Sequence, residues 1–310
     1  MNVTELIQRT REILGETPQI TTAPTQWTDA EILRAINSGY MSAWNAARGA
    51  DEQWGMDFKL LSELAPTIVY VGGFAHVTLP VELGDILYVE DDTSATNDQG
   101  NVVPHVGVAK FRSSPGRYDF VSPRFRRWTF GGAQNVLLFS QESGFDSSKV
   151  RVWFARHVPA LARFTVSTYP GANTLRVDRI AGATLGVLSQ DDLAYRNTWI
   201  QCTVVTADAA PEGRKFFATG WSAATHPNFD LSLTAAHGAS GTTVWETLPL
   251  IPEPHHELLA WLGALRALAK NGESTLVSLI ANEVGRLRDE FIGLIENRQM
   301  QTPRYVNHEG

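Results

Sequence analysis

The residues whose types could do chemistry fall into small groups, and one group opens an expected helix. His255, His256 and Glu257 are adjacent there, so their side chains point about 100° apart around the helix axis. They cannot converge on one metal ion as the histidines of an HExxH motif do, and a polar helix start is the favoured interpretation. The chain also contains neither a GxxxxGK[ST] phosphate loop nor a GxSxG nucleophile elbow.

A second group is an acidic loop with the oxygen-bearing side chains of Asp91, Asp92, Asn97 and Asp98. These oxygens could bind calcium, but the ligand spacing of an EF-hand loop is absent, so a solvated loop is favoured. No ligand spacing connects the scattered histidines His76, His105, His157, His226 and His237. We therefore expect no catalytic residue, no metal site and no cofactor, and we expect that the protein is not an enzyme.

Basic and aromatic side chains alternate between residues 110 and 130. The basic members are Lys110, Arg112, Arg117, Arg124, Arg126 and Arg127, and the aromatic members are Phe111, Tyr118, Phe120, Phe125, Trp128 and Phe130. Grooves that bind single-stranded nucleic acid use this mixture, but so does a half-buried strand with a cationic outer face. Because the net charge of the chain is −7, we favour a charged interface to an acidic partner and keep nucleic-acid binding as the alternative. Arg124, Arg126 and Arg127 are the interface candidates in this stretch.

The composition is that of a folded protein of two or three domains. The chain has 310 residues, of which 43% are hydrophobic and 19% are charged. Its single cysteine, Cys202, excludes an intramolecular disulfide and a cysteine-based zinc site. The most apolar helical stretch, 258–268, contains Arg266 and is too short to cross a bilayer, and the N-terminus does not have the pattern of a secretory signal. We therefore expect no membrane association.

The best-specified element is the stretch from Trp27 to Trp44. Thr28 occupies an N-cap position and Glu31 follows three residues later, which is the capping-box pattern. Apolar residues then recur every three or four positions, so the predicted helix must bury one face. Asn37 and Ser38 lie off that stripe and are candidates for a subunit contact.

The remaining periodicity predicts helices at both ends and β-structure between them. Helical spacing occurs at residues 4–14, 258–268 and 274–294, and an apolar cluster at Trp54–Leu64 suggests a short third helix. A hairpin is predicted at 67–79, and further strands at 136–139, 150–156, 164–168, 174–177, 199–205, 229–234 and 242–248.

The predicted fold class is α+β. We expect a discontinuous helical bundle made from the two chain ends, residues 1–65 and 252–297, with one or two inserted antiparallel β-domains. The first insert is a β-rich domain at 66–160, and the second is a β-sandwich or barrel at 161–251. An extended C-terminal tail occupies 298–310.

This order of parts resembles the head-to-tail adaptor, or connector, proteins of tailed bacteriophages. In that family a short helix precedes a helix of the pattern W-T/S-D-x-E-[LI]-L-x-x-[LI]-N, matched here by Trp27, Thr28, Asp29, Glu31, Ile32, Leu33, Ile36 and Asn37. A β-rich middle follows. The chain then returns through a strand, 150–158, and a helix of the type P-x-E/P-x-H-x-x-L, matched by Pro252, Pro254, His255 and Leu258. The resemblance covers residues 1–160 and 249–297, and residues 162–248 are more β-structure than the simplest adaptors carry.

The resemblance implies a non-enzymatic virion protein. Its subunits would form a ring, a dodecamer, docked beneath the portal protein in the neck between capsid and tail, after assembly in the host cytoplasm. Tail or neck proteins would be further partners, and genomic DNA would pass through the lumen without sequence-specific binding. We expect the C-terminal tail to become ordered against a neighbouring subunit or the portal, with Gln299, Thr302, Pro303, Arg304 and Tyr305 as interface candidates.

The alternative function is a carbohydrate-binding or hydrolytic phage tail protein. Sugar sites also combine aromatic side chains with loop carboxylates in β-domains. The residues that suggest such a site are Trp199, Trp221, Trp245, Asp191 and Asp192. Each tryptophan lies within or beside an alternating run, however, so a place in the β-domain core is the favoured interpretation for them.

Overall fold

The computed structural model divides the chain into two compact units. Unit 1 comprises residues 1–52 and 158–310, and unit 2 comprises residues 53–157. Helices and antiparallel β-structure are both present, which confirms the predicted α+β class. The residues that the structure describes are 1–16, 26–51, 54–64, 66–71, 74–79, 85–91, 101–103, 128–130, 136–139, 146–171, 173–178, 184–188, 195, 197–205, 212–222, 227–231, 242–271 and 274–301.

The helices described in unit 1 come from both ends of the chain. They are α1 (Val3–Ile13), α2 (Asp29–Ala50), α4 (His256–Asn271) and α5 (Ser274–Gln301). The predicted capping box of α2 is confirmed, because the Thr28 hydroxyl accepts from the Glu31 backbone N–H while the Glu31 carboxylate accepts from the Thr28 N–H. An N-cap of this kind contributes about 1 kcal/mol to helix stability, so it favours a helix that begins at Asp29.

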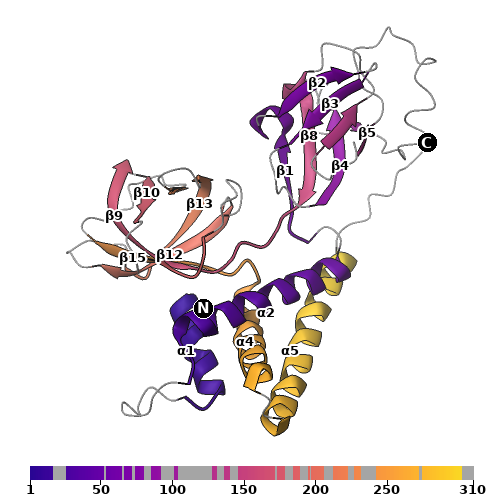
Figure 1. Cartoon of the computed structure of the whole chain (residues 1–310). Helices are drawn as coiled ribbons and strands as arrows, with labels where there is room; N and C mark the ends of the chain where they lie inside the picture. Colours follow the sequence, from indigo (N-terminus) through magenta and orange to yellow (C-terminus); the bar gives the residue numbers. More distant parts are fainter. Residues whose placement is uncertain are drawn as a thin grey trace. The chain divides into compact units, whose positions relative to one another are not determined.

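Helix α2 crosses α4 closely because glycine occupies the crossing point in each helix. A Cβ atom built on Gly39 would lie 2.6 Å from Leu262 Cβ, and one built on Gly263 would lie 2.6 Å from Ile36 Cγ1. Each helix therefore brings its backbone against a side chain of the other. Helices α1 and α5 also contact α4, and Figure 1 shows the indigo helices of the N-terminal end beside the orange and yellow helices of the C-terminal end.

The β-structure of unit 1 is a six-stranded antiparallel barrel. Its strands follow the order β10-β14-β13-β12-β15-β9, and β9 pairs back onto β10, so the sheet closes on itself and β11 adds to the side of β9. Closure removes the exposed strand edges that favour aggregation. The strands are β9 (Arg163–Gly171), β10 (Thr174–Val177), β11 (Thr184–Leu185), β12 (Thr198–Val205), β13 (Lys215–Ser222), β14 (Asn228–Leu231) and β15 (Thr243–Thr247).

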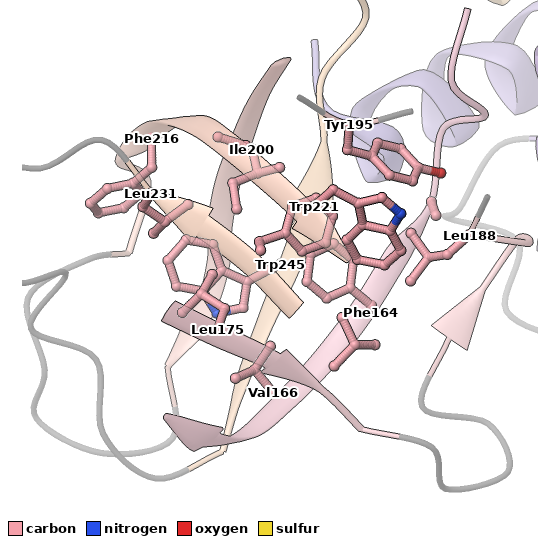
Figure 2. Close-up of a cluster of buried hydrophobic side chains, with 14 of the residues drawn as sticks. Phe164, Val166, Leu175, Leu188, Tyr195, Ile200, Phe216, Trp221, Leu231 and Trp245 are labelled. Carbon is pink, nitrogen blue, oxygen red and sulfur yellow. The ribbon is translucent and has the colours of Figure 1, made fainter. Parts of the chain in front are cut away.

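Aromatic side chains form much of the barrel core (Figure 2). The rings of Phe164 and Phe229 stack with centroids 5.0 Å apart, and those of Tyr195 and Trp221 form a T-shaped pair with centroids 5.1 Å apart. Trp245 is fully buried, and its indole N–H donates to the Thr243 hydroxyl at 2.7 Å. Burying an aromatic side chain of this kind contributes about 2 to 3 kcal/mol before entropy, so these rings account for much of the barrel's stability.

A buried carboxylate joins the barrel to helix α1. Glu246 on β15 is fully buried, and it accepts hydrogen bonds from the Thr4 backbone N–H at 2.8 Å and from the Thr4 hydroxyl. Thr4 lies in the first turn of α1, where backbone N–H groups lack partners within the helix and the helix dipole favours negative charge. The Arg163 guanidinium lies 3.8 Å from the same carboxylate. The charge of Glu246 is therefore compensated although water does not reach it.

Unit 2 contains two antiparallel sheets of four strands among its described residues. One has the order β1-β8-β4-β5 and the other the order β2-β3-β7-β6. The predicted hairpin is confirmed, because β2 and β3 pair from Thr67↔Thr78 to Val71↔Phe74. The strands are β1 (Met56–Leu60), β2 (Thr67–Val71), β3 (Phe74–Thr78), β4 (Asp85–Asp91), β5 (Asn101–Val103), β6 (Trp128–Phe130), β7 (Val136–Phe139) and β8 (Val150–Ala155).

The structure differs from the sequence-based expectations in the type of one element and in two boundaries, and it adds strands β4, β5, β6, β11 and β13, which the periodicity did not predict. The apolar cluster at 54–64 is not a third α-helix: it forms strand β1, which pairs with β8, followed by a 3₁₀ turn at Leu61–Leu64. Unit 2 consequently begins at Gln53, whereas the sequence-based division begins the first β-domain at residue 66. Residues 298–301 continue α5, so the extended tail expected from 298 does not begin there. None of the helices within the described residues is long and apolar enough to cross a membrane.

Candidate interaction surface

The outer face of α2 is polar and positively charged. Positions separated by three or four residues share a face of a helix, and here they lie opposite the stripe that packs on α4. Arg266 of α4 reaches the same face. We define the outer α2 face as Arg34, Ser38, Met41, Ser42, Asn45 and Arg48 together with Arg266; Arg48 is partly buried and the others are exposed.

Arg266 ties the two helices together across this face. One guanidinium nitrogen donates to the Ser38 hydroxyl at 2.7 Å, and the other terminal nitrogen donates to the Ser42 hydroxyl. The Ser42 hydroxyl in turn donates to the Ser38 carbonyl at 3.3 Å. Because Ser38 and Ser42 are one helical turn apart, the guanidinium is held along that turn with its charge exposed.

The exposed arginines of the outer α2 face are Arg34 and Arg266. The acidic residues within α2 are Asp29 and Glu31 in its first turn, and Asp51 is its C-cap. No described carboxylate forms an ion pair with Arg34 or Arg266. Helix α5 differs in this respect, because its Arg286 forms ion pairs with carboxylates three residues before it and four residues after it.

The structure separates the two contact residues predicted on α2. Ser38 lies on the outer α2 face. Asn37 instead binds the chain itself: its amide N–H donates to the Leu161 carbonyl at 3.0 Å, and its oxygen accepts from the Leu161 N–H at 2.7 Å. The Asn37 side chain thus pairs with both the N–H and the C=O of Leu161, in the segment that leads into the barrel. This is a structural role within one subunit.

Of the other predicted interface residues, the structure describes only one. Gln299 lies within helix α5. Arg124, Arg126 and Arg127 lie outside the described residues, as do Lys110, Arg112 and Arg117 of the same basic stretch and Thr302, Pro303, Arg304 and Tyr305 of the C-terminal tail. Those predictions therefore stay predictions. Sequence reasoning missed Arg34 and Arg266, although the spacing of Arg34, Ser38, Ser42 and Asn45 opposite the apolar stripe was a usable signal.

A second exposed surface lies on unit 2, at strand β2. This strand is at the edge of its sheet and pairs with β3 on one side. Three consecutive residues are exposed, with Val69 at 51%, Tyr70 at 42% and Val71 at 54%. An apolar edge strand is a template onto which a strand of another chain can pair.

The tryptophans of the carbohydrate alternative are dispersed. Trp221 and Trp245 are buried in the barrel core, as the favoured interpretation predicts, and the structure does not bring them to a surface. Trp199 is 47% exposed on β12, and its ring forms a T-shaped pair with that of Phe217, with centroids 5.2 Å apart. Asp191 and Asp192 lie outside the described residues.

The perturbed titratable groups have structural causes. Burial and, to a smaller extent, the nearby α-amino group of Met1 lower the pKa of His256 to about 4. The Met1 ammonium donates to His256 Nδ1 at 2.7 Å, so the ring proton must be on Nε2, which donates to the Ile251 carbonyl. Burial also raises the pKa of the Cys202 thiol to about 12, which makes it a poor nucleophile. Within the described residues, no three His, Cys, Asp or Glu side chains are grouped so that they could hold a metal ion.

Comparison with protein-family models and with curated proteins finds no match to this chain.

Proposed function

We propose that the protein is a structural subunit of a phage adaptor ring, which joins the portal to the tail and lets genomic DNA pass through its lumen. The subunit would lie in the virion neck and would contact the portal on one side and tail or neck proteins on the other. A closed ring, a dodecamer by resemblance, needs two different surfaces on each subunit, because neighbours in a ring meet head to tail.

The observation that carries this proposal is the packing of helices from opposite ends of the chain. Helix α2 meets α4 at Gly39 and Gly263, and α4 also contacts α1 and α5. We propose that these helices are the discontinuous bundle expected for an adaptor core. The strands β1 to β8 lie between α2 and α4 in the chain, which is the order of parts on which the resemblance rests, and the barrel is an addition to that order.

In this proposal the barrel is an addition to the adaptor pattern, because residues 162–248 are more β-structure than the simplest adaptors carry. The barrel is fixed to the helices through Glu246 and Thr4, and through Tyr40, whose hydroxyl accepts from the Leu250 N–H at 2.7 Å. A barrel held by buried hydrogen bonds moves with the helices as one body. It is therefore suited to being the rigid outer part of a ring subunit rather than a tethered module.

The proposal is tested by mixing the purified protein with the portal of the same phage and measuring mass by light scattering. We expect a complex whose mass corresponds to a portal with several copies of this chain. A portal variant that lacks its tail-proximal surface provides the control. Elution of the chain as an unbound monomer in the presence of intact portal would contradict the proposal.

One observation supports the carbohydrate alternative, namely the exposed Trp199 beside Phe217 on the barrel surface. Aromatic rings in such a position can stack on a sugar ring. A glycan array with the wild-type protein and with Trp199→Ala separates the two functions. The alternative predicts glycan binding that the substitution abolishes, whereas the adaptor proposal predicts no glycan binding by either protein.

A further inference from the structure

Helix α5 has a charged face whose sign is opposite to that of the outer α2 face. We define the outer α5 face as the side of α5 opposite its buried residues; it contains Asn282, Gly285, Asp289, Gly293 and Glu296. Asn282, Asp289 and Glu296 are exposed and recur at intervals of seven residues, so they form one line along the helix. Within the described residues, neither carboxylate has a hydrogen bond or an ion pair. The outer α5 face therefore presents two negative charges that no described cation neutralises.

The charges on the two faces have similar spacings. Asp289 and Glu296 are seven positions apart, which is about 10.5 Å along a helix that rises 1.5 Å per residue. On the outer α2 face, Arg266 is held at the turn Ser38–Ser42, whose midpoint lies six positions, or about 9 Å, after Arg34. Two arginines on one face and two carboxylates on the other thus lie at nearly the same interval.

Two glycines of the outer α5 face have no packing role within the subunit. A Cβ atom built on Gly285 or on Gly293 would have no atom within 4 Å beyond its own turn of helix. Glycine in a helix interior lowers helix stability, so packing within one subunit does not explain these two residues. At Gly39 and Gly263 the absence of a side chain lets a second helix approach closely. The backbone at Gly285 and Gly293 offers the same access to a helix from outside the subunit.

We propose that the outer α2 face of one copy of this chain docks on the outer α5 face of a second copy. Arg34 and Arg266 pair with the two carboxylates. Met41, which is 55% exposed, packs on the backbone of α5 at the two glycines. Each face points away from the buried side of its own helix, so one chain cannot join its own two faces. Because the two faces differ, the contact is head to tail and can repeat from copy to copy.

An unrelated acidic protein is the competing occupant of the outer α2 face. It would leave Asp289 and Glu296 without cationic partners, whereas a second copy provides partners for both faces at once. The sign, spacing and exposure of the charges on this chain therefore favour the second copy. Closure of the copies into a ring rests on the proposed function, but the pairing of the two faces does not.

The test exchanges the charges of the two faces in the full chain and measures self-association by analytical ultracentrifugation. The wild type should associate as its concentration rises, and added salt should weaken the association because it screens the ion pairs. The α2 double variant is Arg34→Glu with Arg266→Glu. The α5 double variant is Asp289→Lys with Glu296→Lys. Each should weaken self-association on the order of a hundredfold, because like charges then face each other across the contact.

An equal mixture of the two double variants should restore association. In the mixture, the acidic α2 face of one variant meets the basic α5 face of the other, and the two unchanged faces also have opposite charges. Each variant alone lacks such a pair of faces. Restoration by mixing therefore distinguishes a direct contact between these faces from a general effect of charge or of misfolding.

The matched control is Lys149→Glu with Arg214→Glu, which makes the same change in charge at two exposed positions that belong to neither face. It should associate like the wild type, and circular dichroism should show unchanged helix content in every variant. A monomeric wild type, a control as weak as the α2 double variant, or a mixture that does not associate would overturn the inference. Binding of poly-glutamate by a monomeric wild type, lost in the α2 double variant, would also overturn it and would identify an unrelated acidic protein as the occupant.

The outcomes distinguish this inference from the proposed function. If the charge exchange behaves as expected but no portal complex forms, the inference stands and the adaptor proposal fails. If the portal complex forms and the α2 double variant gives a complex of the same mass, the adaptor proposal stands and the inference fails.

Discussion

At the scale of single residues, buried polar groups stabilise unit 1. One of them, His256, makes the stability of the protein depend on pH. The pKa of His256 is lowered to about 4 in the folded protein from an ordinary value of 6.5. The unfolded chain therefore takes up the proton first as the pH falls. Stability is lost between about pH 6.5 and pH 4, and the loss is up to about 3 kcal/mol, because each pKa unit corresponds to about 1.4 kcal/mol.

This prediction is checked with His256→Gln, which keeps a donor for the Ile251 carbonyl but does not titrate. Urea unfolding at pH 7.5 and at pH 5 should show a smaller loss of unfolding free energy in the variant than in the wild type. An equal loss in both proteins would show that other groups cause the acid sensitivity.

Residue types alone could not predict how two of the candidate residues are used. Asn37 and Ser38 are neighbours off the same apolar stripe, and the sequence gives no reason to separate them. Asn37 forms hydrogen bonds with Leu161, which lies 124 positions further along the chain. Ser38 accepts a hydrogen bond from Arg266, which lies 228 positions further along the chain. Tertiary packing determines which residues so distant in the sequence become partners, and sequence periodicity cannot predict that packing.

At the scale of elements, the crossing of α2 and α4 depends on glycine. Gly39→Ala would place a Cβ atom 2.6 Å from Leu262 Cβ, so the helices must separate, at a cost on the order of 1 to 3 kcal/mol. Gly49 in the same helix has no atom within 4 Å of such a Cβ atom, and Gly49→Ala should stabilise the protein by about 0.5 to 1 kcal/mol. Thermal melting followed by far-UV circular dichroism should give shifts of opposite sign for these two variants, and equal shifts would show that the crossing is not close.

The predictability of each element follows from its pattern. Helix α2 and the β2–β3 hairpin were predicted because a cap, a long apolar period or a strict alternation marks each of them. Strand β13 was missed because a bulge between Ala218 and Gly220 shifts its register, so that Trp221 faces the core although the alternation is broken. Strand β1 was taken for a helix because a short apolar run has no decisive period, and only its pairing with β8 determines its structure.

At the scale of the whole molecule, the chain offers exposed surfaces of different chemistry. The outer α2 face on unit 1 is cationic, and the β2 edge on unit 2 is apolar. In an adaptor ring, a subunit needs contacts for its neighbours, for the portal and for the tail. An apolar edge of this kind can pair with a strand of another chain.

The measurement that tests the central claim most directly is electron microscopy of the purified protein mixed with the portal of the same phage. The account predicts axial views in which a ring of this chain is stacked on the portal ring, with an open central channel wide enough for duplex DNA. Portal rings without added density, beside dispersed monomers of the chain, would contradict it.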